Sequence, residues 1–135
     1  MTNGWLQGKV FVIIGGTAGL GLAAAIRCIE EGAKVVVVGR DEERTAAARD
    51  ALGPNALALH GDATDAATSR DAIARALSGF GGFHGLYHVA GGSGRRFGDG
   101  PLHEMSDEGW ARTLHWNLDS VMLSNRAALQ YFMDH

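Results

Sequence analysis

The feature that most constrains the fold is a glycine-rich turn between a short apolar run and a helical pattern, in the segment FVIIGGTAGLGLAAAI (residues 11–26). Gly15, Gly19 and Gly21 have the spacing G-x-x-x-G-x-G. In such a turn the first glycine allows a tight exit from the strand, the second lets a pyrophosphate approach the backbone, and the third lets helix and strand pack closely. The N–H groups at the start of the helix favour an anion. The segment therefore predicts a phosphate-binding turn, with a tight turn that binds nothing as the alternative.

Four short apolar runs alternate with helical patterns along the chain. Strands are expected at residues 9–14, 34–38, 56–60 and 83–89. Helices are expected at residues 19–31, over about ten residues after an N-cap at Asp41, from a cap at Thr64 to a break at Gly79–Gly82, and from Ser106 towards His135. This alternation is typical of a parallel sheet covered on both faces, and right-handed crossovers favour the strand order 3-2-1-4. The sequence therefore predicts a single α/β domain over residues 1–135, a Rossmann-like doubly wound sheet that is incomplete.

The composition excludes several classes of protein. Hydrophobic residues make up 46% and charged residues 20% of the 135 residues, which is enough for a packed core. The formal net charge of −3 argues against general nucleic-acid binding, and aliphatic runs of about five residues are too short to span a bilayer. The start of the chain has no signal-peptide pattern, and the single cysteine, Cys28, excludes an internal disulfide. We therefore expect a cytoplasmic protein with no membrane or nucleic-acid partner.

The end of the second expected strand bears on the choice of cofactor. It reads VVGR, so that Gly39 and Arg40 stand about twenty residues after the glycine turn, where the adenosine ribose of a dinucleotide lies. An acid there would select NAD(H), whereas an arginine can bind a 2′-phosphate through two hydrogen bonds. The sequence therefore favours NADP(H) over NAD(H). The alternative is that Arg40 pairs with the neighbouring acids Asp41 and Glu42.

Two other kinds of nucleotide site also use a glycine-rich turn. A Walker loop is excluded because no Gly-Lys-Ser/Thr follows the turn. An S-adenosylmethionine-dependent transferase stays open as an alternative, although the second strand lacks a terminal acid that could hold both ribose hydroxyls.

Four segments, in order, resemble the short-chain dehydrogenase/reductase family: LQGKVFVIIGGTAGLG, HGDATD, HVAG and WNLDSVMLSNRAALQYF. The resemblance covers nearly the whole chain and implies hydride transfer between NADP(H) and a carbonyl or alcohol substrate. It implies that the cofactor is bound by Gly15, Thr17, Ala18, Gly19, Leu20, Gly21, Arg40, Asp62, Ala63, Ala90 and Gly91, with Asp62 on the adenine amino group. It also places Asn117 in the family's catalytic tetrad, while His88 and Val89 stand where the family has two asparagines.

The other members of that tetrad do not occur in these residues. The resemblance requires a serine after a fifth strand and a Tyr-x-x-x-Lys segment, but no lysine follows Tyr87 or Tyr131 at the fourth position, and none occurs after Lys34. We therefore expect a chain truncated before the catalytic segment, able to hold a cofactor but not to turn it over. His88 and His115 titrate in a suitable range, but the sequence shows no residue placed to orient either. A nucleotide-binding or scaffolding module without enzymatic activity is the other alternative.

The six histidines do not predict a metal site. His84 and His88 are four positions apart, which would suit a metal ion on a helix. On a strand, that spacing corresponds to about 13 Å, too far for two ligands of one ion.

The last expected helix, residues 107–134, is apolar on more than one side. Trp110, Leu114, Leu118, Val121 and Phe132 follow one stripe, and Trp116, Leu123 and Ala127 follow another. A helix that is apolar all round is expected to be buried, here under its own sheet. In the resembled family this helix also packs against its copy in a second subunit, so we expect a homo-oligomer.

Overall fold

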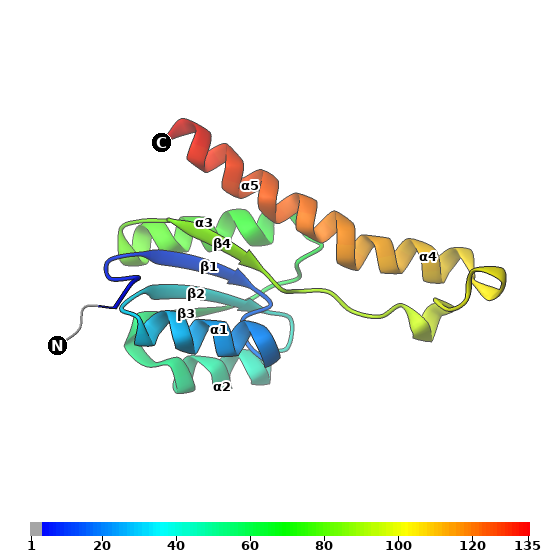
Figure 1. The fold of residues 1–135 in the computed structure, drawn as a ribbon, viewed down its shortest axis with the longest axis horizontal. Coiled ribbons are helices and arrows are strands. Elements are labelled where there is room, and N and C mark those ends of the chain that lie inside the picture. The colour runs from blue at the N-terminus through cyan, green and yellow to red at the C-terminus, as the bar shows by residue number, and fades with distance from the viewer. Residues whose placement is uncertain (1–3) are drawn as a thin grey trace.

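A computed structural model describes residues 4–135. Residues 1–3, which belong to the segment judged to have no signal-peptide pattern, lie outside the described residues. Its centre is a sheet of four parallel strands, β1 (Val10–Ile14), β2 (Lys34–Gly39), β3 (Ala56–His60) and β4 (Gly85–His88). The strands lie in the order β3-β2-β1-β4 (Figure 1). This confirms the predicted α/β class and the predicted strand order.

Helices cover both faces of the sheet (Figure 1). The α-helices of the described residues are α1 (Gly19–Glu30), α2 (Glu42–Leu52), α3 (Ala66–Phe80), α4 (Asp107–Leu114) and α5 (Ser120–Asp134). Short 3-10 turns occur at Gly53–Asn55, Arg95–Phe97 and Leu102–Glu104, and a single π turn, His115–Asp119, joins α4 to α5. Helices α1 and α2 lie on one face of the sheet, and α3 and α5 lie on the other.

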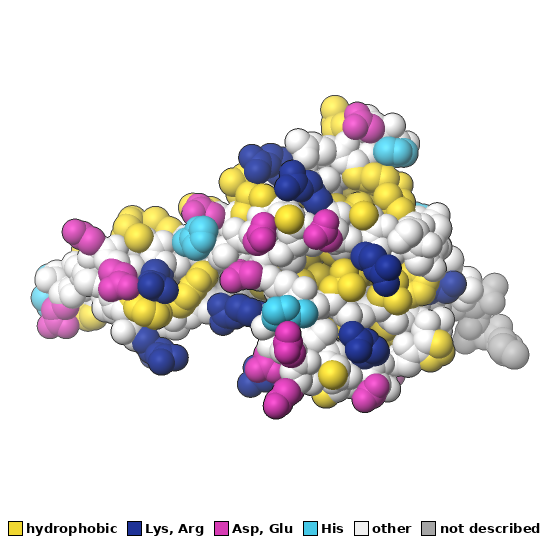
Figure 2. All heavy atoms as spheres, turned by 180° about the vertical axis from the view of Figure 1, so that it is seen from behind, with side chains coloured by type: hydrophobic (Ala, Val, Ile, Leu, Met, Phe, Trp, Pro, Cys, Tyr) yellow, Lys and Arg dark blue, Asp and Glu magenta, His cyan; other side chains and the backbone are white. Residues whose placement is uncertain are grey.

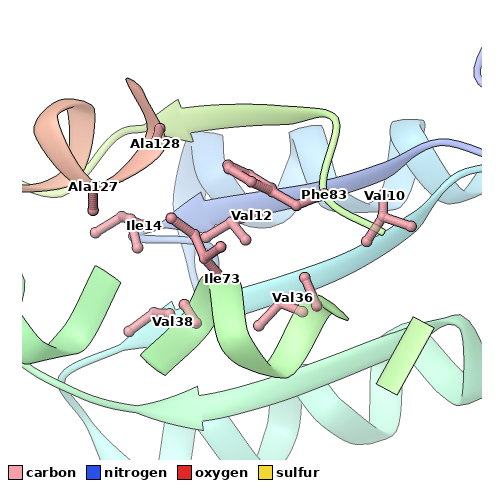
Figure 3. Packing of buried hydrophobic residues seen from close by; sticks show 11 residues of the cluster. Val10, Val12, Ile14, Val36, Val38, Ile73, Phe83, Ala127 and Ala128 are labelled. Atoms are coloured by element: carbon pink, nitrogen blue, oxygen red, sulfur yellow. The ribbon is translucent and has the colours of Figure 1, made fainter. Parts of the chain in front are cut away.

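Alternate side chains of the central strands fill two separate cores. One core contains Val10, Val12, Ile14, Val36 and Val38 against α3 and α5, as Figure 3 shows. The other contains Ile13, Val35 and Val37 against α1 and α2. The four valines of β2 are therefore all buried, as their uninterrupted run predicts. Burial of each valine side chain contributes about 1.5–3 kcal/mol to folding.

Two predicted boundaries were wrong by one or two residues. Helix α3 is capped by Asp65, whose carboxylate accepts the N–H of Ala67, and not by Thr64. Thr64 instead bonds to Asp62 through its backbone N–H and its hydroxyl. Strand β4 is shorter than residues 83–89, since Phe83 enters the core before the ladder with β1 begins.

The expectation that residues 107–134 form one helix buried beneath the sheet was also wrong. The π turn interrupts the helix, and α4 projects beyond the sheet (Figure 1). Small residues face inward from α5, among them Ser124, Ala127 and Ala128, and they let the helix lie close to α3 and β4. Several large apolar side chains of the segment are exposed instead: Trp110 is 53% exposed and Leu118 59%. Figure 2 shows hydrophobic side chains along this projecting part of the surface.

The long helical segment has no membrane-spanning character. Within residues 4–135, no helix is both long enough and apolar enough to cross a bilayer.

Candidate functional site

The residues predicted to bind a cofactor meet at one edge of the sheet. The glycine turn follows β1, Arg40 follows β2, Asp62 follows β3, and Ala90 follows β4. All four strands are parallel, so their carboxyl ends lie together. In open parallel α/β sheets, ligands bind in the crevice outside these ends.

Gly15 is fitted tightly into this edge. Its N–H and that of Gly16 both donate to the carbonyl of Val38, at 2.9 and 3.0 Å. Gly15 has φ +86°, and a Cβ added there would lie 2.6 Å from the backbone nitrogen of Ala90. The first glycine of the turn therefore allows the backbone after β1 to contact the backbone after β4.

The start of α1 leaves its N–H groups open. Ala18, the residue before the helix, offers no side-chain cap. Gly19 has φ +53° and nothing within 4 Å of an added Cβ, and the neighbouring Leu20 side chain is 75% exposed. Gly21 packs so closely on Gly15 that a side chain there would collide with the Gly15 carbonyl. This arrangement, an uncapped helix start with open space before it, suits an anionic group.

Thr17 explains why no side chain stands at position 39. The Thr17 side chain is buried, and a Cβ on Gly39 would collide with its hydroxyl oxygen. Arg40 is thus the first side chain after β2 that can reach the site edge, and it is exposed.

Arg40 does not pair with the acids that follow it. Asp41 caps α2 by accepting the N–H of Arg44 at 2.9 Å. Among the described residues, no ion pair joins Arg40 to Asp41 or Glu42 within 4.0 Å. Its guanidinium lies over the indole of Trp116 instead, with Cζ 5.9 Å from the ring centroid.

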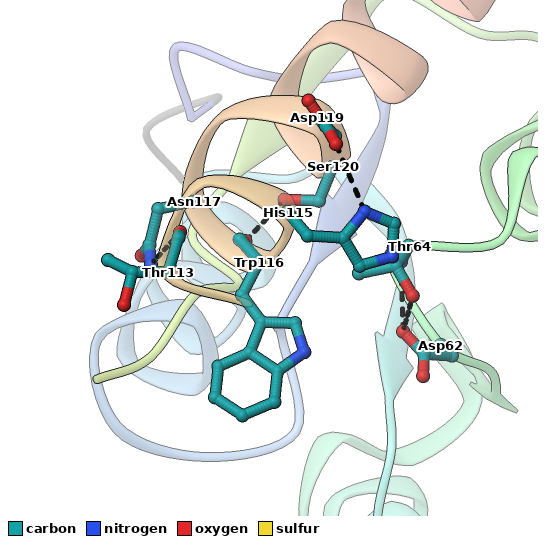
Figure 4. Close-up of polar contacts among 8 residues, drawn as sticks. All are labelled: Asp62, Thr64, Thr113, His115, Trp116, Asn117, Asp119 and Ser120. Carbon is teal, nitrogen blue, oxygen red and sulfur yellow. Dashed lines mark hydrogen bonds and ion pairs between the residues drawn. The ribbon is translucent and has the colours of Figure 1, made fainter. Parts of the chain in front are cut away.

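Asp62 is fixed and kept ionised. Its Oδ1 accepts the backbone N–H of Thr64 at 2.9 Å and the Thr64 hydroxyl at 2.8 Å (Figure 4). The backbone N–H of Thr64 is the main cause that lowers the pKa of the Asp62 carboxyl, and the charges of Arg40 and His115 lower it further. The chain therefore holds one carboxylate oxygen, Oδ1, while Oδ2 accepts no hydrogen bond from any residue in the range 4–135. Ala63, the next residue, is partly buried and packs against the core between the sheet and α3 and α5.

Asn117 connects the π turn to the loop after β4. Its amide nitrogen donates to the carbonyl of Gly92 at 2.6 Å and to that of Thr113 at 2.8 Å, and its oxygen accepts the Gly92 N–H at 3.1 Å. Ala90 and Gly91 lie directly before this anchored residue. In this structure Asn117 therefore holds the backbone that leads from the cofactor edge.

His88 has partners, contrary to the expectation from sequence. Its Nε2 lies 3.0 Å from the Ala90 carbonyl, which can only accept, so this nitrogen carries the hydrogen. Its Nδ1 lies 2.7 Å from the Ser124 hydroxyl, and the Ser120 hydroxyl lies 3.3 Å from Nε2. Burial lowers the pKa of the His88 imidazole, although the bond to Ala90 opposes this effect.

His115 is oriented as well. Its Nδ1 lies 3.0 Å from the Asp119 carboxylate, four residues along the π turn. Figure 4 shows the His115 ring leaving the turn on the side opposite to Asn117, towards Thr64 and Asp62.

Two features of the site were not predicted. Trp116 was assigned only to an apolar stripe, yet its indole contacts Arg40 at the cofactor edge. Ser120 and Ser124 were not singled out, although they hold His88. Their sequence signal is weak, because two serines spaced i,i+4 inside a helix are common on buried faces of small residues. Within residues 4–135 no three potential metal-ligating side chains come together as a site.

Comparison with known proteins identifies the family. A family model described as short chain dehydrogenase matches residues 9–135. The 2,5-dichloro-2,5-cyclohexadiene-1,4-diol dehydrogenase LinX of Sphingobium indicum is 41% identical over 127 residues, covering 92% of this chain and 49% of that protein. The 2-(S)-hydroxypropyl-CoM dehydrogenase 3 of Xanthobacter autotrophicus is 35% identical, covering 92% and 48%. The chain thus spans about half the length of the curated relatives it matches.

Solved structures agree with this match. A short chain dehydrogenase from Mycobacterium smegmatis superposes with a TM-score of 0.86 at 34% identity, covering 96% of this chain and 54% of that one. A short-chain dehydrogenase/reductase described as a glucose/ribitol dehydrogenase, from Brucella melitensis, gives a TM-score of 0.84 at 30% identity, covering 96% and 54%. The fold, the order of the motifs and the extent of the family match together show that the chain belongs to the short-chain dehydrogenase/reductase family.

Proposed function

We propose that this chain binds NADP(H) at the carboxyl edge of its sheet and serves hydride transfer between that cofactor and a small carbonyl or alcohol substrate. The main support for this proposal is that the residues following all four parallel strands lie together at the carboxyl edge of the sheet. The open start of α1 suits the pyrophosphate, Arg40 suits the ribose end, Asp62 suits the adenine amino group, and the Ala90–Gly91 backbone suits the nicotinamide half. The cofactor itself supplies the hydride, and the chain supplies binding and orientation.

The preference for NADP(H) rests on Arg40. Its side chain is exposed, and its neighbours Asp41 and Glu42 do not engage it, as described above. A 2′-phosphate would give the guanidinium a charge-assisted partner, whereas the 2′-hydroxyl of NAD(H) would find no acid at position 39. An S-adenosylmethionine-dependent transferase receives no support from this edge or from the family.

Residues 1–135 by themselves are proposed to bind the cofactor without turning it over. Reduction of a carbonyl needs a proton donor, which typically contributes 10²–10⁴-fold to the rate. Asn117 cannot serve, because an amide does not release a proton near neutral pH and its groups already bond to Gly92 and Thr113. The Nε2 hydrogen of His88 is likewise committed, to the carbonyl of Ala90. The family match does not favour a binding module without enzymatic activity, although the position of Asn117 is explained by its hydrogen bonds to Gly92 and Thr113 alone.

A second copy of the chain is proposed to cover the outer face of α5. This face presents Met122, Leu129 and Met133 around a shallow hollow, and Leu129 is 60% exposed. Large apolar side chains grouped in this way are typical of an interface.

A cytoplasmic location is proposed because the one cysteine, Cys28, is free.

Titration calorimetry tests the cofactor assignment. Wild type should bind NADPH more tightly than NADH and should not bind S-adenosylmethionine. Arg40→Ala should weaken NADPH binding by about ten- to a hundredfold and NADH binding little, since it removes a charge-assisted contact of about 1.5–3 kcal/mol. Arg44→Ala, which removes another exposed arginine nearby, is the matched control. Equal losses for NADPH and NADH would contradict the assignment.

A further inference from the structure

A hollow lies in the loop that follows β4, directly beyond the Ala90–Gly91 backbone. It begins at Gly92, whose N–H and carbonyl both bond to the side chain of Asn117. Its volume is about 770 Å³, a size typical of small-molecule sites. The residues that line it all come from this loop: Gly92, Ser93, Arg95, Asp99, Gly100 and Pro101. A substrate whose reacting carbon faces the nicotinamide would therefore extend towards this hollow.

The loop has a definite shape although five of the ten residues 91–100 are glycine. Gly94 is buried, and a Cβ there would collide with the hydroxyl of Thr113 on α4. Gly98 has φ +97°, and a Cβ there would collide with the Ser106 side chain before α4. Glycine loses more conformational freedom on ordering than other residues, so these close contacts hold a segment that would otherwise move freely. The hollow is thus formed by a positioned loop, the kind of element that often carries binding residues.

Arg95 is the one cationic side chain in the lining. Its backbone is fixed, because its N–H donates to the hydroxyl oxygen of Ser93 at 3.2 Å and its carbonyl accepts the N–H of Gly98 at 3.2 Å. Its side chain is exposed, and within residues 4–135 the guanidinium forms no hydrogen bond, ion pair or cation–π contact. The hollow therefore offers the guanidinium and the Ser93 hydroxyl as hydrogen-bond donors.

The acid in the same lining has another partner. Asp99 accepts the hydroxyl of Thr113 through Oδ2 at 2.9 Å, and its backbone N–H donates to the carbonyl of Gly94 at 3.2 Å. Among the described residues, no ion pair within 4.0 Å joins it to Arg95. Asp99 thus ties the loop to α4, and the charge of Arg95 stays available to an anion from outside the chain.

On these grounds, and resting on the proposed function, we propose that Arg95 selects substrates that carry a carboxylate remote from the reacting carbon, namely hydroxy acids and the corresponding keto acids. A guanidinium binds a planar carboxylate through two parallel N–H···O bonds, and the Ser93 hydroxyl can donate one more. Arg95 is a specificity-determining residue in this proposal. It holds the acidic end of the substrate and takes no part in the transfer of hydride or proton.

Titrations of ¹⁵N-labelled residues 1–135 loaded with NADP⁺, followed by NMR, test this selection. The probes are lactate, 3-hydroxybutyrate and 4-hydroxybutyrate, each compared with its primary amide, which has nearly the same shape and no charge. At least one acid should bind about 5- to 50-fold more tightly than its amide, as expected for a charge-assisted contact on an open surface. The backbone signals that shift should include those of Gly92, Ser93 and Arg95.

Arg95→Ala should reduce the affinity for that acid to the level of its amide and leave the affinity for NADP⁺ and for the amide unchanged. Arg95→Lys keeps the charge without the paired donors and should retain part of the preference. Arg96→Ala is the matched control, because this neighbouring arginine is also exposed but does not line the hollow. The spectra themselves show whether each variant is folded.

The outcomes separate this inference from the proposed function. A wild-type chain that binds NADP⁺ but binds no acid more tightly than its amide would overturn the selection by Arg95 and leave the proposed function standing. Equal losses of acid binding in Arg95→Ala and Arg96→Ala would also overturn it, since the effect would then come from general positive charge. A wild-type chain that binds neither NADP⁺ nor NADPH would overturn the proposed function and, with it, the assignment of this hollow to a substrate.

Discussion

The imidazole of His88 is tied to helix α5 by Ser124, whose hydroxyl lies 2.7 Å from Nδ1. Its other nitrogen donates to the carbonyl of Ala90, the residue that touches Gly15 across the cofactor edge. One side chain thus connects the outer helix with the backbone beside the glycine turn. Asparagine stands at this position in the resembled family, and histidine likewise offers one donor and one acceptor here.

Loss of the Ser124 hydroxyl should destabilise the fold. Ser124→Ala leaves the Nδ1 of a partly buried imidazole without a partner, and we expect a decrease of about 1–2 kcal/mol in the free energy of unfolding. Urea denaturation at pH 7.5 measures it. Asn125→Ala, on the exposed side of the same helix, is the control and should change stability by no more than about 0.5 kcal/mol. Equal effects of the two variants would show that the contact with His88 contributes nothing.

The stability of the fold should depend on the protonation of His88. Burial lowers the pKa of this imidazole in the folded state below 6.5, so the unfolded chain takes up the proton first as the pH falls. The stabilising contribution is therefore complete above pH 6.5 and is lost as the pH falls towards the folded pKa. In His88→Gln, whose amide keeps a donor for Ala90, unfolding free energy should fall less between pH 7.5 and 5.5 than in wild type. The other five histidines are common to both proteins, so parallel pH profiles would contradict this.

Two glycines of the turn should respond differently to alanine. Gly15→Ala places a Cβ 2.6 Å from the backbone of Ala90 at φ +86°, so strain and overpacking should together cost about 2–4 kcal/mol of stability. Gly19→Ala meets open space and should cost about 1 kcal/mol through its positive φ alone. Gly19→Ala should nevertheless weaken NADPH binding, because its methyl group would occupy the open space in which we propose that the pyrophosphate binds. Denaturation measures the stability of both variants, and calorimetry measures their NADPH binding. If Gly19→Ala were less stable than Gly15→Ala, the close approach of Gly15 to Ala90 would be unimportant.

The outer face of α5 should mediate association. Light scattering at micromolar concentration should show a mass above the 14.2 kDa of one chain. Leu129→Glu should shift the population towards the monomer, since it places a charge in the lining of the apolar hollow. Ser78→Glu adds the same charge at an exposed position of α3, outside this hollow, and should do so far less. A wild-type chain that is monomeric throughout would rule out the interface.

The sheet could be predicted from sequence because its signals are local and repeated. An uninterrupted run such as Val35–Val38 indicates a strand buried on both faces, and right-handed crossovers leave few strand orders. The turn at Gly15 could be predicted for the same reason. The cap of α3 could not be predicted, because Thr64 and Asp65 are adjacent and both residue types can cap a helix. Asp65 is the cap here because Thr64 bonds to Asp62 instead.

The rest of the site depends on contacts between distant segments. Ser124 stands 36 residues after His88, and no local pattern joins them. The π turn has no sequence signature of its own, so the direction of Trp116 could not be foreseen. The apolar pattern of α5 predicts that the helix is buried, but it does not tell whether its own sheet or another chain covers it. In the structure, small residues such as Ala127 face inward and large ones such as Leu129 face outward.

The central claim is that these 135 residues hold NADPH but do not turn it over. The most direct measurement follows one preparation of residues 1–135, first by calorimetric titration with NADPH and then by NADPH absorbance during incubation with a broad panel of aldehydes and ketones. The account predicts saturable binding and no consumption of NADPH above the rate without protein. Steady consumption that is abolished by Asn117→Ala or His88→Gln would contradict it, because the chain would then carry out the reaction without the tyrosine and lysine.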